Sequence, residues 1–214
     1  MSSATSANAS ARRSGTKGVA RADREQQILD VAGRVFAEHG FTATSVADIA
    51  DQAGISKPLI YNYFGSKDGL FERCLQVASE LLVAEIERTA QLDVVGIDRA
   101  LATLDGVFKV LAGRPWMWRI ANDPTAPEIG LALLGSYRRR LEDIAIVGVG
   151  QLLTLAGDHD PLDLEALTAV WSSVFSALVT WWIEHPDVTP EEMTSRCGRL
   201  FGVVFGVVPE SPGA

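Results

Sequence analysis

The chain has 214 residues, of which 47% are hydrophobic, and it carries a formal net charge of −8 and two cysteines. This hydrophobic content excludes a largely disordered protein, and two distant cysteines exclude a disulfide framework or a zinc site. The charge is uneven, because residues 1–67 hold eight Lys/Arg against six Asp/Glu, whereas residues 68–214 hold eleven against twenty-one. Cys74 and Cys197 both fall in helical patterns, so we expect them to be buried, reduced thiols.

The first 20 residues are rich in small residues, and no acidic residue precedes Asp23. They are predicted to form a disordered basic tail, and Arg12, Arg13 and Lys17 could follow a phosphate backbone. The polar N-terminus predicts no signal peptide, and the apolar run 144–157 is too short to cross a bilayer. We therefore expect a soluble cytoplasmic protein with no membrane partner.

Helical spacing of apolar residues begins at Arg21 and continues through Val35 and Phe36 to Gly40, where the first helix is expected to end. A second helix is expected from Val46 to the glycine at position 54, with Thr44 or Ser45 as its N-cap.

A third helix is predicted to start at Ser56, with Pro58 in its first turn, where proline costs least. Ile60 and Phe64 lie four residues apart and should face inward, which leaves most of this helix exposed. Helix, short glycine turn and helix form the helix-turn-helix pattern, whose second helix enters the DNA major groove. Residues 21–67 are therefore predicted to be a DNA-binding domain.

The rest of the chain is helical in pattern, with glycine and proline at the breaks. No strand is expected, so the fold class is all-α, with a larger helical domain for effector binding and dimerisation over 68–208 and a tail over 209–214. The expected helices of this domain span Asp68–Ala90, Ile97–Ala112, Trp116–Ala121, Pro127–Ala156, Leu162–His185 and Pro190–Val208.

Two patterns near the C-terminus predict a dimer. Apolar residues between 164 and 181 recur in steps of three and four, which is a heptad seam. Three glycines then recur every fourth residue, and each interior glycine costs about 1 kcal/mol against alanine, so close helix approach is the natural reason for them. The alternative is tight packing within one subunit. The predicted interface residues are Leu167, Val174, Leu178, Trp181, Gly198, Gly202 and Gly206.

Aromatic residues gather around the proline- and glycine-broken middle of the chain, where they could wall a pocket for an apolar or aromatic ligand. The alternative for each of them is an ordinary core position. The predicted pocket residues are Phe108, Trp116, Met117, Trp118, Tyr137, Trp171 and Phe175.

Catalysis is the rival class of function, and the sequence offers little for it. His39 and His185 close helices, and His159 lies in Gly-Asp-His-Asp-Pro, which is better interpreted as a polar turn than as a metal site. The sequence contains no nucleophile order, phosphate loop or paired metal spacing that stands out. We expect no enzyme activity, no catalytic residues, no metal and no cofactor.

The segment TSVADIADQAGISKPLIYNYFGSKDGL, residues 44–70, follows a first helix of about twenty residues. With that helix it resembles the N-terminal domain of TetR-type transcriptional regulators. The resemblance implies a homodimeric repressor, released from double-stranded operator DNA by a small effector bound in the C-terminal domain. Alternatives are a regulator without a ligand and an activator.

The resemblance also implies DNA contacts. Thr44 and Ser45 would contact a DNA phosphate. Lys57, Tyr61 and Tyr63 would lie in or beside the major groove, and Lys67 would hold the DNA backbone.

Two residues depart from the family pattern. Pro58 replaces a frequent glycine, and Leu59 stands where a small or hydroxyl residue is common and could touch a thymine methyl group. Asn62 could pair with adenine or simply face solvent.

Overall fold

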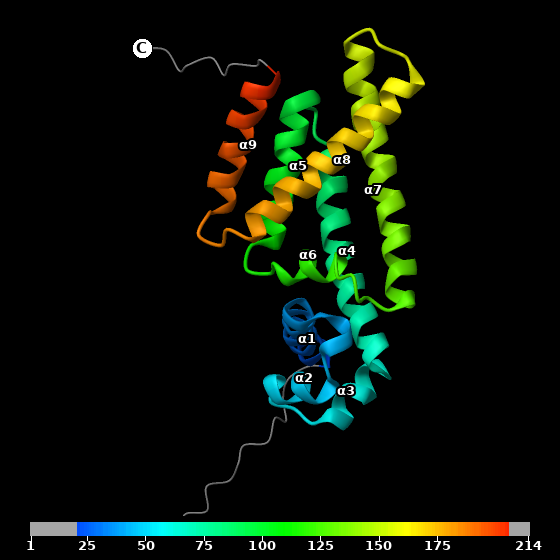
Figure 1. Ribbon diagram of the computed structural model, residues 1–214, viewed down its shortest axis with the longest axis vertical. Coiled ribbons are helices and arrows are strands. Elements are labelled where there is room, and N and C mark those ends of the chain that lie inside the picture. Colours follow the sequence, from blue (N-terminus) through cyan, green and yellow to red (C-terminus); the bar gives the residue numbers. More distant parts are fainter. Residues whose placement is uncertain (1–20, 206–214) are drawn as a thin grey trace, which may run out of the picture.

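The computed structural model describes residues 21–205, and within this range it contains nine helices and no strand. The predicted all-α fold class is therefore confirmed (Figure 1). The expected tails and Gly206 lie outside the described residues. The helices are α1 Arg21–Ala43, α2 Val46–Ala53, α3 Lys57–Phe64, α4 Lys67–Ala90, α5 Gly96–Leu111, α6 Trp116–Ala121, α7 Glu128–Leu155, α8 Pro161–Ile183 and α9 Pro190–Phe205.

Helix α1 differs from its prediction at its C-terminal end. Gly40 has φ 77° and ψ 163°, a conformation that glycine adopts without strain, but helical hydrogen bonding resumes after it and the assigned helix runs on to Ala43. The expected end at Gly40 is thus a kink, because the chain turns there and then forms one more short helical turn. The other helices with both ends described begin and end within two residues of their expected positions.

The first three helices form a small unit around one core. Ile28, Leu29 and Phe36 of α1 pack with Ile49 of α2 and Ile60 of α3, and all five side chains are buried. The N-cap of α2 is Ser45, whose side chain exchanges hydrogen bonds with Asp48 in a capping box. Gly54 ends α2 in the left-handed conformation predicted for it, with φ 64° and ψ 33°.

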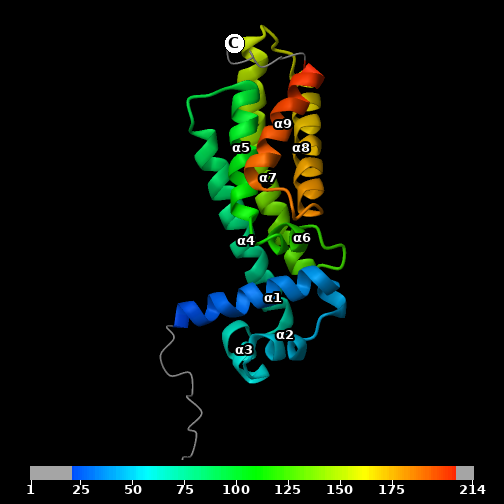
Figure 2. The ribbon, with the colours of Figure 1, turned by 90° about the vertical axis from the view of Figure 1, so that its left-hand side faces the viewer.

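Helix α4 joins this unit to the rest of the protein. Figure 2 shows α1 lying across one end of the molecule, with α2 and α3 on its outer side and the longer helices on its inner side. Helices α5 and α7 pack on the far half of α4, α8 packs on α7 and α9 packs on α5, while α6 lies between this assembly and α1 (Figures 1 and 2). The core of this larger part includes Leu104, Phe108 and Leu111 of α5, with Met193 and Cys197 of α9.

Helix α8 is the apolar exception among the described residues. By length and composition alone it could cross a bilayer, and most of it is not buried within the chain. Both properties also suit a helix that a second protein surface covers.

Candidate DNA-binding and effector sites

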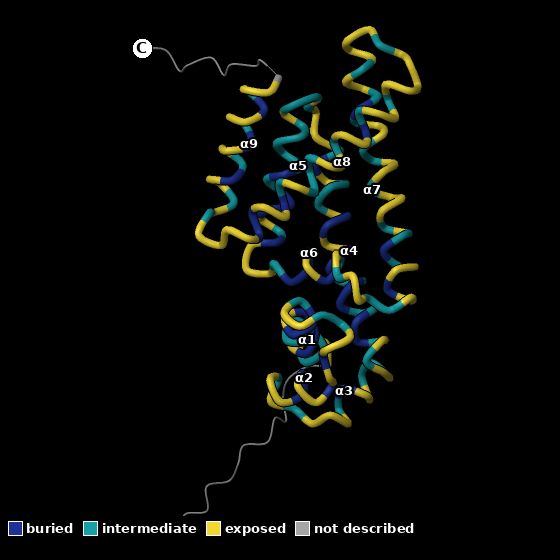
Figure 3. Tube along the Cα trace, viewed as in Figure 1, coloured by how far each residue is buried: buried dark blue, intermediate teal, exposed yellow. Residues whose placement is uncertain are grey.

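The outer face of α3 carries several of the predicted DNA contacts. Lys57, Pro58, Tyr61 and Asn62 are exposed, whereas Ile60 is fully buried beneath them. Figure 3 shows this end of the molecule largely exposed, with buried positions on its inner side. Helix α3 therefore presents one largely polar face to solvent, as a helix that enters the major groove requires.

Leu59 and Tyr63 differ from the expectation that they lie outside, because both are half-buried. The Tyr63 ring packs 5.8 Å from the ring of Phe64, measured between centroids, so only part of it can reach a ligand. The Arg21 guanidinium lies 5.3 Å from the Tyr63 centroid, which brings the start of α1 to α3. Sequence reasoning missed Arg21 as a candidate, although a basic residue at the start of α1 was its signal.

Thr44 and Ser45 occupy different environments. Thr44 is 3% exposed and its hydroxyl donates to the Gly40 carbonyl over 2.8 Å, so its side chain is turned away from a phosphate. The Ser45 hydroxyl is exposed, and it donates to Asp48 Oδ2 over 2.7 Å. Hydrogen bonds from Ser45 lower the pKa of Asp48, which keeps this carboxylate charged beside the cap.

Lys67 has a structural role within the protein, in addition to the expected contact with the DNA phosphate backbone. Its Nζ donates to the carbonyl oxygens of Phe41 and Thr44 over 2.7 and 2.8 Å, and it lies 4.2 Å from the Phe41 ring centroid. The ammonium group thereby closes the corner between α1, α2 and α4. A phosphate contact by Lys67 stays a prediction, and two of its three donors are already engaged.

The larger part of the molecule contains a cavity of about 1120 Å³ between α4, α5, α7 and α8. Four of the predicted pocket residues line it: Trp118, Tyr137, Trp171 and Phe175. Its wall is mostly apolar, with side chains such as Leu82, Ile86 and Leu134. A largely apolar cavity with a few polar groups is the usual form of a small-molecule site.

Three predicted pocket residues do not line this cavity. Phe108, Trp116 and Met117 are at most 2% exposed and belong to the core. Phe108 packs against Trp182, with ring centroids 5.0 Å apart. Trp116 covers Gly33 of α1 so closely that a Cβ atom there would overlap the indole ring. They are the ordinary core residues that the sequence allowed as the alternative.

Few polar groups of the cavity are charged. The guanidinium of Arg99 donates to the Leu92 and Val94 carbonyls and to Gln151 Oε1. Burial, with a further contribution from the charge of Glu80, raises the pKa of Tyr137, so its phenol is neutral at physiological pH. The Trp118 indole donates to Thr180 Oγ1 over 3.0 Å.

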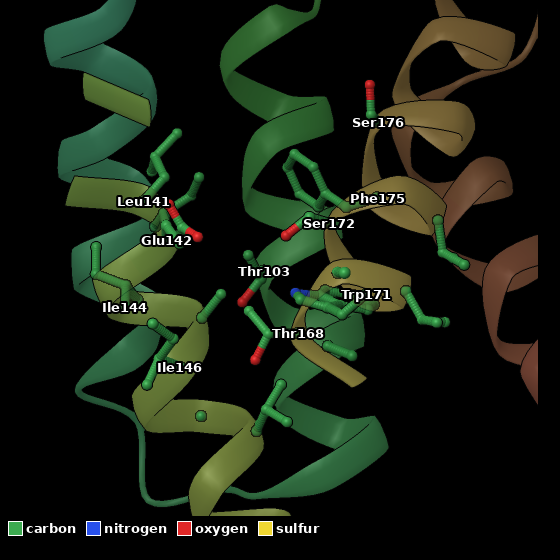
Figure 4. Close-up of a pocket in the computed structure, with 18 of the residues that line it drawn as sticks. Thr103, Leu141, Glu142, Ile144, Ile146, Thr168, Trp171, Ser172, Phe175 and Ser176 are labelled. Atoms are coloured by element: carbon green, nitrogen blue, oxygen red, sulfur yellow. The ribbon is translucent and has the colours of Figure 1, made fainter. Parts of the chain in front are cut away.

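Thr168 is the polar residue that sequence reasoning missed. Figure 4 shows its side chain between α7 and α8, beside Thr103 and Trp171. It is 6% exposed, and its hydroxyl has no hydrogen-bond partner within residues 21–205. No signal in the sequence distinguishes it from other helical threonines.

Helix α6 joins the cavity to the first three helices. Its Trp118 and Ala121 line the cavity, while Trp116 packs on Gly33. Just after α6, the Asp123 carboxylate accepts a hydrogen bond from the Phe41 amide over 2.7 Å. A shift of α6 would therefore change the packing both at the cavity and at α1 of the DNA-binding unit.

The predicted heptad seam of α8 faces mostly into its own chain. Leu167 and Val174 line the cavity, and Leu178 packs against the core, because this side of α8 faces its own chain. Trp181 is exposed, with the His185 ring stacked on it at a centroid distance of 3.8 Å. Val170 is also exposed, and it belongs to the lining of the cavity.

The predicted glycine stripe of α9 also turns inward at Gly198, where a Cβ atom would lie 3.7 Å from Leu101 Cδ1 of α5. This fits the alternative of packing within one subunit. Gly202 is half-buried. The exposed apolar side chains of α9 are Leu200, Val203 and Val204.

No group of three or more His, Cys, Asp or Glu side chains in residues 21–205 could hold a metal ion.

A family model described as bacterial regulatory proteins, tetR family, matches residues 28–74. Over 170 residues the chain is 33% identical to the HTH-type transcriptional repressor Rv1474c of Mycobacterium tuberculosis, a match that covers 68% of this chain and 89% of that protein. It is also 33% identical over 88 residues to the HTH-type transcriptional activator FasR of Mycolicibacterium smegmatis, covering 41% of this chain and only 40% of the activator.

Solved structures show the same fold over nearly the whole chain. A TetR-like transcriptional regulator from Rhodococcus sp. RHA1 has a TM-score of 0.71 at 24% identity, covering 88% of this chain and 99% of that one. The regulator FadR from Bacillus subtilis, solved in complex with stearoyl-CoA, has a TM-score of 0.68 at 16% identity, covering 86% and 99%.

Proposed function

This chain belongs to the TetR family of bacterial transcriptional regulators, and we propose that it is a homodimeric repressor released from a near-palindromic operator by a small apolar or aromatic effector. The observation that carries the proposal is the cavity, which shares α4 and α6 with the DNA-binding end. Relatives in this family are regulators, not enzymes.

The outer face of α3 supports the DNA-binding half of the proposal. Lys57 lies 5.9 Å from the Tyr61 ring centroid, so a cation, a phenol and the Asn62 amide share one exposed surface. We propose that Tyr61 and Asn62 reach base edges and that Lys57 and Ser45 contact phosphates. Lys67 holds the first three helices in position from the corner between α1 and α2. We propose that Pro58 and Leu59 determine which operator sequence the protein prefers.

Exposed apolar residues support the dimer. Trp181 of α8 and Leu200, Val203 and Val204 of α9 would leave a large apolar area in water if the chain stayed monomeric. We propose that a second copy covers them. The two α3 helices would then lie about 34–36 Å apart, one turn of DNA.

Coupling follows from the two helices that the sites share. An effector that fills the cavity presses on Leu82 and Ile86 of α4 and on Trp118 of α6. Displacement of either helix changes the separation of the two recognition helices. A preference of a few kcal/mol for the wrong separation is enough to release the operator.

The test is selection of bound DNA from a random pool with the full chain, repeated with a panel of hydrophobic compounds. Recovery of a near-palindrome, lost with at least one compound, is the expected result, and Tyr61→Ala should abolish the enrichment. Full, sequence-specific binding by Tyr61→Ala would contradict the groove assignment. A monomer at micromolar concentration in sedimentation would contradict the dimer.

A second outcome of the same experiment would distinguish a regulator that has no ligand from the proposed effector-controlled repressor. Operator binding that no hydrophobic compound changes would favour a constitutive regulator. Because the partly matched relative FasR is named an activator and the more fully matched Rv1474c a repressor, a reporter gene behind the selected operator decides the direction of control.

A further inference from the structure

We infer that the cavity takes an uncharged, mainly apolar molecule with one hydroxyl or carbonyl group, and that the Thr168 hydroxyl binds this group. The inference rests on the proposed function, because it names the chemical class of the effector that the cavity would hold. Two independent observations carry it: an unpaired buried hydroxyl, and a wall in which none of the charged side chains is buried.

The Thr168 hydroxyl is buried without a hydrogen-bond partner in residues 21–205. Such groups are rare in native proteins, because a buried hydroxyl that loses its contact with water is unfavourable unless it is paired. Neighbouring Thr103 is different, since its hydroxyl donates to the Arg99 carbonyl over 2.9 Å. Thr103 and Thr168 both belong to the cavity wall, but only Thr168 is left with its hydrogen-bonding capacity unused (Figure 4).

Rotation of the hydroxyl allows it to donate to a carbonyl oxygen or to accept from a ligand hydroxyl. Around it the wall is apolar or aromatic, with Trp171, Leu164 and Val149 among the lining residues. A buried, unpaired anchor in a largely apolar chamber of about 1120 Å³ matches a ligand with a polar group on a large hydrocarbon body.

The charged lining residues argue against an anion. Arg99 is committed to three protein oxygens, and exposed Arg138 donates to the Ala121 carbonyl over 3.5 Å. The other two charged residues of the wall, Glu142 and Glu165, are acids. A carboxylate or phosphate carried into the apolar interior would lose its hydration without meeting a buried cation, which is strongly unfavourable. Both acids are exposed, so they lie where water also stabilises a cation and give no reason for one to enter the apolar interior.

The experiment uses three probes with the same ten-carbon chain: 1-decanol, decanoate and decylammonium. Binding to the full-length protein is followed at pH 7 by quenching of tryptophan fluorescence, to which the lining residues Trp118 and Trp171 contribute. We expect 1-decanol to bind at least tenfold more tightly than either ion. Equal or tighter binding of decanoate or decylammonium would overturn the inference while leaving an effector cavity in place.

Any apolar cavity prefers a neutral probe, so the decisive variant is Thr168→Val, which keeps the shape and removes the hydroxyl. Loss of one hydrogen bond should weaken 1-decanol binding about three- to tenfold. The melting temperature of the free variant should be unchanged or raised, because an unpaired buried hydroxyl has been removed.

Thr44→Val is the control. Thr44 is also a buried threonine, but its hydroxyl donates to the Gly40 carbonyl over 2.8 Å and it lies in the DNA-binding unit, outside the cavity lining. It should lower the melting temperature and leave 1-decanol affinity within twofold. Undiminished binding by Thr168→Val, or an equal loss in both variants, would overturn the role of Thr168. Failure of all three probes to bind would overturn this inference and the effector cavity together.

Discussion

Asp123 and Phe41 are 82 residues apart, and the Asp123 carboxylate accepts a hydrogen bond from the Phe41 amide over 2.7 Å. The second oxygen of Asp123 accepts from the amide and the hydroxyl of Thr125, and the Thr125 hydroxyl in turn accepts from the Thr42 amide. One carboxylate thus holds the loop after α6 against the end of α1. This junction is a direct polar connection between the effector side and the DNA-binding side.

Replacing Asp123 with alanine should destabilise the protein by about 1–3 kcal/mol, because the half-buried Phe41 amide loses a charged acceptor. Urea unfolding checks this as a lower midpoint at unchanged slope. Asp143→Ala removes an exposed acid of α7 and should stay within about 0.5 kcal/mol of the wild type. Equal midpoints for the two variants would show that the junction contributes nothing to stability.

A second prediction concerns stability and follows from the close contact between Gly33 and Trp116. Alanine is normally the better helix residue by about 1 kcal/mol, but a Cβ atom on Gly33 would overlap the indole ring. Gly33→Ala should therefore destabilise the protein, by about 1–3 kcal/mol, as α1 and α6 are forced apart.

Gly135→Ala is its control, because a Cβ atom on that α7 glycine would meet only Arg139 Nη1, at 3.7 Å. It should be neutral or stabilise the protein by up to about 1 kcal/mol. The two variants should shift the thermal midpoint in opposite directions, and a stabilising Gly33→Ala would contradict the close packing.

Lys57→Ala should weaken DNA binding about equally for all sequences, because a lysine at a phosphate neutralises charge without reading bases. The slope of the logarithm of the binding constant against the logarithm of salt concentration should fall by about 1. Fluorescence anisotropy at several salt concentrations measures both. Lys109→Ala, which removes an α5 lysine bonded to Asp105 at 2.7 Å, should change neither, and an unchanged slope in Lys57→Ala would remove the phosphate assignment.

The proposed dimer is tested by two exposed valines. Val204 on α9 is 71% exposed and Val147 on α7 is 59% exposed, and neither lines the cavity. Val204→Glu should shift the protein towards monomer in sedimentation equilibrium, because a charge would be buried in the dimer without a partner. Val147→Glu should leave the dimer intact. Dissociation by Val147→Glu alone would move the interface to α7.

The two thiols should be unreactive in the folded protein. Both are buried, and burial raises the pKa of Cys197 to about 11 and that of Cys74 further. The thiolate fraction at pH 8 is therefore very small, and reagent access is blocked. Reaction with the aromatic disulfide 5,5′-dithiobis(2-nitrobenzoate) should be negligible in buffer and should release two equivalents of thionitrobenzoate per chain in urea. A thiol that reacts within seconds in buffer would contradict this burial.

Local patterns predicted the helices and their ends because the information is local. Ser45 and Gly54 act through residues within one helical turn, so cap chemistry reveals them. The exposure of Lys57 and Tyr61 follows from the same reasoning, since Ile60 fixes the inner face of α3.

Contacts between distant segments were outside the reach of such patterns. Trp116 was expected at a ligand and lies on Gly33, because aromatic content alone does not distinguish a cavity wall from a core. Gly198 faces α5 within its own chain, since a small-residue stripe does not say which helix approaches. Thr168 and Asp123 gave no signal because their importance depends on neighbours that only the fold supplies.

The Lys67 ammonium, bonded to the carbonyls of Phe41 and Thr44, has a consequence for the construction of chimaeric regulators. Gly69 adds to it, because any side chain there would overlap the Phe64 carbonyl oxygen. The first turns of α4 are thus fixed to the helices before them, although later turns of the same helix line the effector cavity. A DNA-reading module transplanted onto another sensor should carry these turns with it, and the splice belongs in the middle of α4.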